Sequence, residues 1–442
     1  MKRSIVIVIA VIAAAALVAV AILHRVPGEH GQPKNRKVPA GFVTQRDGKL
    51  WLDGQPYRFA GVNLWYGAIL GSTGVGGDRE RLQRELDNLH ALGLDNLRIL
   101  VGADGNGTEP HQVTPCLQTA PGVYNDTLLD GLDYLLSEMQ KRQMKAVLYM
   151  NNAWGWSGGF SFYLRHAAGL DAPDMIAEGY LPYISVAAEF ARNAEAQRLY
   201  MNHLRYIIGR TNRYTRTAYK DDPTIMAWQL CNEPRVFNDS LYGDMLHWLH
   251  EAAVACKQTD PNHLVSTGSE GIWGCDGHED VHRMLCEDPF IDYLTLHVWP
   301  VNWSWSTPTT LTEQLPQVCE NTAKYIDEHL HLAQELKKPI VIEEFGYPRD
   351  GYSFDREAGV SARDAFVGAV VEVAMHHPII AGMNIWAWGG ECKPQHEMWQ
   401  QGDPLAGDPP QEQQGLYSVF ATDSSTIRIL RMAMNHNNTP TD

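Results

Sequence analysis

Residues 222–235 read DPTIMAWQLCNEPR, and residues 338–351 read KPIVIEEFGYPRDG. Each stretch is a short apolar run that ends on a carboxylate, at Glu233 in the first and at Glu343 and Glu344 in the second. Such runs are typical of strands buried in a parallel sheet. In a parallel α/β barrel the chemistry lies at the carboxyl ends of the strands. Two carboxylates delivered there suit the cleavage of a glycosidic bond, in which one group protonates the leaving oxygen and the other attacks the sugar.

The rest of the chain alternates strand-like and helix-like segments, as expected of a βα series. The predicted strands are 57–64, 95–100, 145–150, 225–231, 264–267, 291–296, 340–343 and 379–385. The predicted helices are 79–92, 128–142, 195–219, 241–256, 313–336 and 362–376. Eight strands, each followed by a helix or a long loop, predict a single (β/α)8 TIM barrel of the α/β class with long βα loops.

The N-terminus has the composition of a targeting segment. Lys2 and Arg3 precede an uninterrupted apolar stretch, residues 5–23, and Arg25 follows it. Positive residues before such a stretch direct the following chain across a membrane. The stretch is also about long enough to span a bilayer. Residues 1–24 are therefore expected to be a signal peptide or an uncleaved signal anchor.

Residues 25–40 are rich in Pro, Gly, Lys and Asn, which is typical of a flexible linker. Residues 41–442 then form the catalytic domain. We expect this domain to work outside the cytoplasm. It is either held by the anchor on the periplasmic or cell-surface side of a membrane or secreted after cleavage.

Net charge and aromatic content narrow the possible partners. A charge of −16 argues against nucleic acid or an anionic membrane surface, because no basic stripe is available to neutralise phosphates. It does not oppose a neutral polysaccharide. The chain has 13 Trp and 18 Tyr, most of which we expect in the core. The tryptophans that follow predicted strands are expected to stack on sugars: Trp154, Trp156, Trp299, Trp303, Trp305, Trp386 and Trp388.

Cysteine and histidine spacing raises the question of a metal site. Four residues are candidates for its ligands: Cys275, His278, His282 and Cys286. The last three are spaced four residues apart, which is about one turn of a helix. An oxidising compartment instead favours a Cys275–Cys286 disulfide. Cleavage of a glycosidic bond by two carboxylates needs no metal, so we expect neither a metal nor a cofactor.

Several motifs along the predicted strands resemble a known family. They are WQLCNEPR at 228–235, LHVWP at 296–300 and IVIEEFG at 340–346. In this order they resemble glycoside hydrolase family 5, whose members are retaining enzymes on a (β/α)8 barrel. The stretches NNAWGWSGG (151–159), HVWPVNWSW (297–305) and NIWAWGGE (384–391) are similar to its β-mannanase branch.

The resemblance implies roles for the carboxylates. Glu233 matches the general acid/base, which requires an environment that keeps it protonated beside an ionised neighbour. Because side chains alternate along a strand, one of Glu343 and Glu344 is expected to point into the barrel mouth and the other away. The family places the nucleophile directly before an aromatic-Gly pair, which selects Glu344.

Four further residues match positions that support the two carboxylates. Asn232 resembles the residue that hydrogen-bonds the sugar 2-hydroxyl. Arg98 resembles the arginine that keeps the nucleophile ionised. His297 and Trp299 match a His-x-aromatic pair that lines the site and orients the nucleophile. Trp299 stands where relatives often have Tyr, so the phenolic hydrogen bond to the nucleophile is not assured.

Aromatic residues after the strands are expected to bind the sugar chain. Trp386 resembles the platform under the sugar at the cleavage point, and its side chain is expected to face a solvent-filled cleft. Trp154 is expected to stack in a neighbouring subsite. His111, Tyr124 and Trp399 are further candidates for outer subsites.

The resemblance implies a retaining β-mannanase that cleaves β-1,4-mannosidic bonds in mannan-type polysaccharides or manno-oligosaccharides. An exo-acting β-mannosidase and a β-1,4-glucanase remain as alternatives in the same class. A non-catalytic glycan-binding barrel is an alternative outside it, opposed by the presence of both Glu233 and Glu344. Residues 391–415 follow the eighth strand and could extend the cleft or block one end of it. The sequence leaves endo and exo action open.

Overall fold

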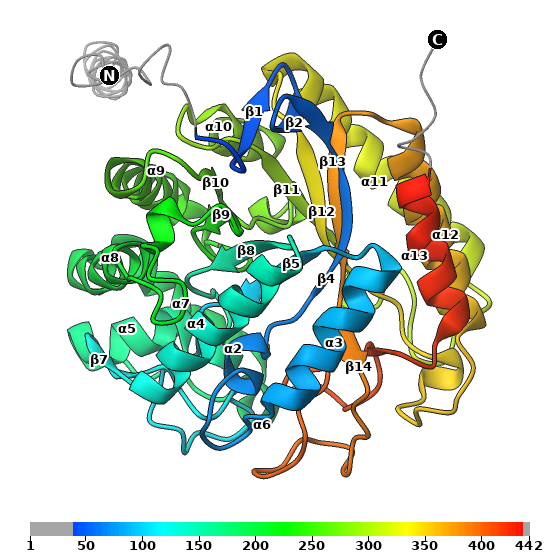
Figure 1. Cartoon of the computed structure of the whole chain (residues 1–442), viewed down its shortest axis with the longest axis horizontal. Helices are drawn as coiled ribbons and strands as arrows, with labels where there is room; N and C mark the ends of the chain where they lie inside the picture. Colours follow the sequence, from blue (N-terminus) through cyan, green and yellow to red (C-terminus); the bar gives the residue numbers. More distant parts are fainter. Residues whose placement is uncertain (1–38, 436–442) are drawn as a thin grey trace, which may run out of the picture. The chain divides into compact units, whose positions relative to one another are not determined.

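The structure is a computed structural model that describes residues 39–435. Within this range, eight parallel strands pair in the order β10-β9-β8-β5-β4-β13-β12-β11, with helices around them (Figure 1). The strands are Phe59–Asn63 (β4), Asn96–Leu100 (β5), Lys145–Tyr149 (β8), Ile225–Gln229 (β9), Leu264–Ser266 (β10), Leu294–Val298 (β11), Ile340–Phe345 (β12) and Ile380–Ile385 (β13). Between β10 and β11 the ring is joined by the Asp292 N–H, which donates to the Val265 carbonyl at 2.9 Å. The predicted (β/α)8 barrel is confirmed.

Each barrel strand is followed by a helix on the outside. These helices are Arg79–Leu92 (α3), Asp126–Lys141 (α4), Ala194–Ile208 (α8), Tyr242–Thr259 (α9), Glu279–Glu287 (α10), Leu315–Leu336 (α11), Ser361–His376 (α12) and Ser424–Asn435 (α13). In α4 the buried leucines Leu128, Leu132 and Leu135 recur every three or four residues, so one face of the helix packs on the strands. The Asn125 side chain caps this helix by accepting from the Thr127 N–H at 3.0 Å.

The loops after β4, β5, β8 and β13 contain short elements of their own. They are Gly67–Leu70 (α2), Gln118–Ala120 (β6), Val123–Tyr124 (β7), Gly159–Ala168 (α5), Met175–Glu178 (α6), Tyr180–Ala187 (α7), Trp388–Gly390 (β14) and Val419–Phe420 (β15). These are the long βα loops that the sequence predicted, and they surround the carboxyl ends of the strands.

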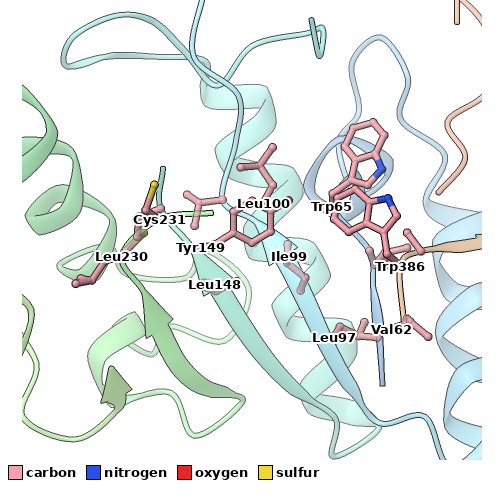
Figure 2. Close-up of a cluster of buried hydrophobic side chains, with 14 of the residues drawn as sticks. Val62, Trp65, Leu97, Ile99, Leu100, Leu148, Tyr149, Leu230, Cys231 and Trp386 are labelled. Carbon is pink, nitrogen blue, oxygen red and sulfur yellow. The ribbon is translucent and has the colours of Figure 1, made fainter. Parts of the chain in front are cut away.

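The core has two layers that follow the alternation along the strands. Outward-facing side chains such as Leu97, Ile99 and Leu148 are buried between strands and helices (Figure 2). A second cluster contains Val147 and Val341 and lies at the amino-terminal end of the barrel. The polar groups of the site are therefore concentrated at the opposite, carboxyl end.

A three-stranded antiparallel sheet that the sequence analysis missed precedes the barrel. It consists of Val43–Arg46 (β1), Lys49–Leu52 (β2) and Gln55–Tyr57 (β3). Val43 and Leu50 belong to the same buried cluster as Val147 and close the amino-terminal end of the barrel. Asp-Gly pairs at 47–48 and 53–54 form the two turns, and all four residues have positive φ. Asp-Gly between short apolar runs is a hairpin signal that would have found this sheet.

The helix predicted over 195–219 is too long. It ends at Ile208, and the chain then turns back on itself. The Asn212 side chain accepts hydrogen bonds from the Tyr214 N–H at 2.8 Å and the Thr215 N–H at 3.2 Å. Arg210 pairs with Asp133 of α4 at 2.7 Å. These local and tertiary hydrogen bonds compete with continuation of the helix.

The predicted targeting segment, 1–24, and nearly all of the predicted linker, 25–40, lie outside the described residues. Among residues 39–435, none of the helices combines the length and the apolar character that a membrane span requires.

The expected Cys275–Cys286 disulfide is not formed. All seven cysteines lie in the described range, and none is paired with another. Cys286 instead contacts His282, one helical turn earlier, at 3.5 Å. Cys275, His278, His282 and Cys286 also do not form a cluster with the donor spacing of a metal site in the described part of the chain.

Candidate active site

Glu233 and Glu344 meet at the carboxyl end of the barrel. One oxygen of each carboxylate and one ring nitrogen of His297 all lie within 4.8 Å of one another. Retaining glycosidases hold their two carboxyl groups about 5–5.5 Å apart, whereas inverting enzymes need about 6.5–9.5 Å. The close approach of the nearest oxygens fits the shorter of these two spacings.

Glu233 lies in the loop after β9 with an unusual backbone conformation. Its φ is +48°, a left-handed value that residues other than Gly rarely adopt. Its N–H donates to the Gly268 carbonyl at 2.9 Å, which ties the residue to the loop after β10. Strained backbone of this kind persists where the surroundings hold it, and it is common at functional sites.

The sequence predicted that Glu343 and Glu344 point in opposite directions. In the structure both side chains instead point into the barrel. Leu296 of β11 pairs with Ile342, but the next residue, His297, pairs with Glu344. Glu343 is thus the extra residue of a β-bulge, and a bulge interrupts the alternation. The Glu343 carboxylate accepts from Gln229 inside the barrel at 2.5 Å, and Glu344 lies closer to the mouth.

Arg98 of β5 is fully buried and connects the acidic residues. Its guanidinium donates to the Glu344 carboxylate, and it lies 3.8 Å from Glu343. It also donates to the side-chain oxygens of Asn232 at 2.7 Å and of Asn63 at 3.0 Å. The structure thus brings Arg98 and Asn232 together as predicted, whereas Asn63 was not singled out. An Asn within an apolar strand is the sequence signal for such a residue.

His297 and Trp299 contact the carboxylates from the end of β11. Nδ1 of His297 lies 2.7 Å from Glu233 Oε1 and 3.4 Å from Glu344 Oε2. The indole N–H of Trp299 donates to Glu344 Oε2 at 3.2 Å. Trp299 therefore supplies through its indole the hydrogen bond that a Tyr would make through its hydroxyl.

Trp154 contacts the acid/base candidate directly. Its indole N–H donates to Glu233 Oε2 at 2.5 Å, and its ring lies 5.6 Å from that of Tyr180. Arg235 lies over the same indole and is bound by both oxygens of Glu270. The sequence analysis missed Arg235 and Glu270, although Arg235 ends the Asn-Glu-Pro-Arg motif.

The pKa values of Glu233 and Glu344 are ordered opposite to the expected roles. Burial raises the pKa of Glu344 to about 7, although the charges of His297 and Arg98 oppose the rise. Burial acts to raise the pKa of Glu233, but His297, Arg235 and Trp154 together outweigh it and lower the pKa of Glu233. Burial disfavours the charged imidazole, yet Glu344 and Glu233 raise the pKa of His297 to about 10. Of the three groups, His297 therefore has the highest pKa and binds a proton most readily.

Trp386 lies at the end of β13 but does not face an open cleft. Its side chain is only 3 % exposed, and its ring meets those of Trp156 and Trp299 edge-on at 6.3 and 6.0 Å. The expectation of a solvent-filled cleft beside this ring is wrong because residues 391–418, the segment between β14 and β15, are held over this end of the barrel. This segment is called the Glu412 loop below.

The three outer-subsite candidates are dispersed. His111 lines a pocket together with Trp156 and Gln411. Tyr124 stacks on Tyr206 of α8 with ring centroids 4.0 Å apart. Trp399 donates to the Asp403 carbonyl within the Glu412 loop. Of the three, His111 thus shares a pocket with Trp156, one of the tryptophans that follow the barrel strands.

Glu233, His297 and Glu344 also have the spacing of metal ligands. Their donor atoms are engaged with one another, and Arg98 already supplies a cation to Glu344. A metal ion here would have to replace these contacts and lie beside the Arg98 guanidinium. The arrangement fits paired acid and base chemistry better than metal binding.

Comparisons with known proteins agree on one family. A family model described as GH family 5 beta-mannosidase-like matches residues 40–439. Mannan endo-1,4-beta-mannosidase 1 of Oryza sativa subsp. japonica is 31% identical over 346 residues, which is 75% of this chain and 73% of that protein. The crystal structure of a glycoside hydrolase family 5 mannosidase from Rhizomucor miehei is similar with a TM-score of 0.81 and 31% identity. That similarity covers 90% of this chain and 97% of the other. An endo-beta-1,4-mannanase from Thermotoga petrophila shares the fold at 22% identity, with a TM-score of 0.67 and coverage of 88% and 79%.

Proposed function

Because the chain belongs to glycoside hydrolase family 5, we propose that it cleaves β-1,4-mannosidic bonds with Glu344 as nucleophile and Glu233 as general acid/base. It is a glycoside hydrolase that acts on β-mannosidic bonds. Mannan-type polysaccharides and manno-oligosaccharides are the proposed substrates. The observation that supports the mechanism is the close approach of the two carboxylates, whose nearest oxygens lie within 4.8 Å of each other, as suits direct attack by one of them on the sugar.

In the first step an oxygen of Glu344 forms a bond to the anomeric carbon while the glycosidic C–O bond breaks. Glu233 gives its proton to the departing oxygen, and the shortened glycan leaves. In the second step Glu233 takes a proton from water, whose oxygen displaces Glu344 from the anomeric carbon. Two inversions at that carbon retain the β-configuration. Arg98 and Trp299 hold the Glu344 carboxylate throughout.

The proton on His297 explains how Glu233 becomes an acid. The 2.7 Å contact between Nδ1 and Oε1 allows the proton to move from the imidazolium to the carboxylate without changing the net charge. The neutral pair is favoured when a sugar expels water from the site, because separated charges are costly in a low dielectric.

Substitution of Glu233 tests this assignment. We expect Glu233→Ala still to be glycosylated by an activated aryl β-mannoside, whose leaving group needs little protonation. Added azide should restore turnover of this variant, with a β-mannosyl azide as the product. Natural β-1,4 substrates should not be cleaved. A variant with normal activity on manno-oligosaccharides would overturn the role of Glu233.

Exo action is a second candidate, favoured by one observation. Glu233 and Glu344 are only 8 % and 2 % exposed beneath the loops, which suits the end of a chain better than its interior. Chromatography of the products from mannohexaose separates the two modes. Mannose alone from the outset means exo action, and mixed oligomers mean endo action.

We further propose that the N-terminal segment exports the enzyme and anchors it or is removed. The support is the basic and apolar pattern of residues 2–25. Fractionation of cells that express the full chain and a chain starting at residue 39 tests this. Only the full chain should reach the membrane or the medium.

A further inference from the structure

A third buried carboxylate, that of Glu343, lies beside the site but has no task in the two reaction steps described above. The side chain is fully buried, and burying a carboxylate costs free energy unless other groups compensate for it. Strict alternation along β12 would let only one of Glu343 and Glu344 face the interior of the barrel. The β-bulge brings both inside, and bulges next to active sites commonly re-aim a side chain. The position of Glu343 therefore indicates a role at the site.

Two donors fix the orientation of the Glu343 carboxylate. Nε2 of Gln229 donates to Oε2 at 2.5 Å, and the Tyr293 hydroxyl donates to Oε1 at 3.3 Å. Burial raises the pKa of Tyr293 well above its usual range, and the charge of Glu343 adds to the rise, so this hydroxyl keeps its proton. The side-chain oxygen of Gln229 in turn accepts from Arg98 at 2.8 Å. The carboxylate therefore has a fixed place beneath the reacting groups.

The two ring nitrogens of His297 lie near different carboxylates. Nδ1 is 2.7 Å from Glu233 Oε1, which is the contact through which a proton can reach the acid/base. Nε2, on the other side of the ring, is 4.0 Å from Glu343 Oε2 and has no hydrogen-bond partner among the described residues. Because the ring is fully buried, a proton on Nε2 is stabilised by the charge of Glu343 and not by solvent.

The position of the second proton on His297 decides whether the ring can act on Glu233. When the Nδ1 proton has moved to Glu233, the neutral imidazole must keep its other proton on Nε2. If Nε2 lost its proton instead, the remaining proton would stay on Nδ1 and Glu233 would have none to donate. A carboxylate beside one ring nitrogen favours a proton on that nitrogen and so selects the tautomer. A buried aspartate does this for the histidine of Ser-His-Asp hydrolases.

Resting on the function proposed above, we propose that Glu343 is a positioning residue, which holds a proton on Nε2 of His297 so that the Nδ1 proton is the one given to Glu233. The transfer breaks the Nδ1–H bond and forms an O–H bond on Glu233 Oε1. The positive charge of the ring and the negative charge of Glu233 disappear together. The Nε2–H bond remains, and it faces Glu343 before and after the transfer.

The dependence of the rate on the leaving group tests this proposal. A dinitrophenyl β-mannoside departs without a proton, whereas the leaving sugar of mannohexaose requires one. For Glu343→Gln we expect kcat/KM to fall by about 10- to 100-fold on mannohexaose and by less than about threefold on the aryl mannoside. Arg98 lies 3.8 Å from Glu343 and binds the nucleophile, so a role through Arg98 would slow both substrates alike. Equal losses on the two substrates would overturn the proposal.

A matched variant separates this effect from damage to the fold. Asp260 is another fully buried carboxylate beside a histidine, with Oδ2 2.5 Å from Nδ1 of His263. His263 directly precedes β10, so this pair lies at the amino-terminal end of the barrel, away from the site. Asp260→Asn should lower the thermal midpoint and leave the ratio of the two kcat/KM values unchanged. A shift of that ratio as large as in Glu343→Gln would make the effect one of stability and overturn the proposal.

Nitrogen-15 NMR of the histidine-labelled enzyme reads both ring nitrogens of His297 without turnover. The signals of this ring are identified by their loss in His297→Asn. Burial lowers the pKa of His297, but Glu344, Glu233 and Glu343 raise it to about 10. In Glu343→Gln one negative charge is removed and the other charged groups of the site stay in place. The imidazolium should therefore lose its proton at a lower pH than in the wild type, and the neutral ring should no longer keep its proton on Nε2 alone.

The NMR titration also separates this proposal from the proposed function. If the titration and the tautomer in Glu343→Gln match those of the wild type, Glu343 does not act on His297 and the inference fails, whatever the enzyme cleaves. If the wild type cleaves neither mannoside, the proposed function fails, and the titration still decides whether Glu343 holds the Nε2 proton.

Discussion

At the scale of single residues, the site depends on where one proton is held. His297, between the two carboxylates, has the highest pKa of the three groups, and burial keeps all three side chains sensitive to one another's charge. Arg98 adds a fixed positive charge on the side of Glu344. The pH dependence of the enzyme should therefore report on Glu344 and His297 together.

The pKa of Glu344, which burial raises to about 7, predicts the acid limb of the activity profile. Below that pH the nucleophile is protonated and inactive, so kcat/KM should rise with pH and level off above about 7. His297→Asn removes a charge that lowers the pKa of Glu344, so its limb should move to higher pH. Trp299→Phe removes an uncharged donor and should move it less. If the acid limb of His297→Asn lies at the same pH as that of the wild type, the charge of His297 does not lower the pKa of Glu344.

The β-bulge gives Glu343 and Glu344 different partners although both face inward. We expect Glu344→Gln to abolish turnover of every substrate, because no other group in the site can form the glycosyl-enzyme. Glu343→Gln should keep measurable turnover, because its carboxylate contacts Gln229 and Tyr293 below the site. Mass spectrometry of the enzyme trapped with a slow 2-fluoro mannosyl fluoride should place the sugar on Glu344. A label on Glu343 would reverse the assignment.

The residues that the sequence identified are those at strand ends, because parallel strands bring their carboxyl ends together whatever the loops do. Arg98, Asn232, Glu233, His297, Trp299 and Glu344 are all of this kind. The course of the Glu412 loop was not foreseen, because it is irregular and depends on buried contacts with Arg349 and Arg363. The bulge at Glu343 was missed because alternation is the default for an isolated strand.

At the scale of secondary-structure elements, the barrel strands were predicted well and the connections less so. Strong apolar runs mark the strands, but helix α8 ended early because Asn212 and Arg210 find partners outside the helix. The sheet β1–β3 was missed because its strands are only three or four residues long.

The sheet β1–β3 should contribute to stability and not to chemistry. Leu50 is buried at the amino-terminal end of the barrel, far from the carboxyl-end site. Leu50→Ala should lower the free energy of unfolding by about 2–5 kcal/mol. Specific activity of the folded fraction should remain near that of the wild type. Lys49→Ala, on the exposed side of the same strand, should change neither quantity, as denaturant titration and kinetics on each variant would show.

At the scale of the whole molecule, the barrel brings together Glu233 after β9 and Glu344 of β12. The spacing between these two carboxylates predicts the stereochemistry of the reaction. Because the nearest oxygens of Glu233 and Glu344 lie within 4.8 Å of each other, we expect direct attack by Glu344 and retention of the anomeric configuration. Proton NMR of the first product should show the β-anomer before mutarotation. An initial α-anomer would contradict double displacement.

The unpaired thiols have a practical consequence for the whole chain. Six of the seven cysteines are buried, and none is joined to another in the described residues. Formation of the native state therefore does not wait for an oxidant, even if the mature enzyme works in an oxidising compartment. A chain starting at residue 39 should fold in the reducing cytosol of a bacterial production host. Its melting temperature should be the same with and without dithiothreitol, and a marked drop on reduction would reveal a cross-link.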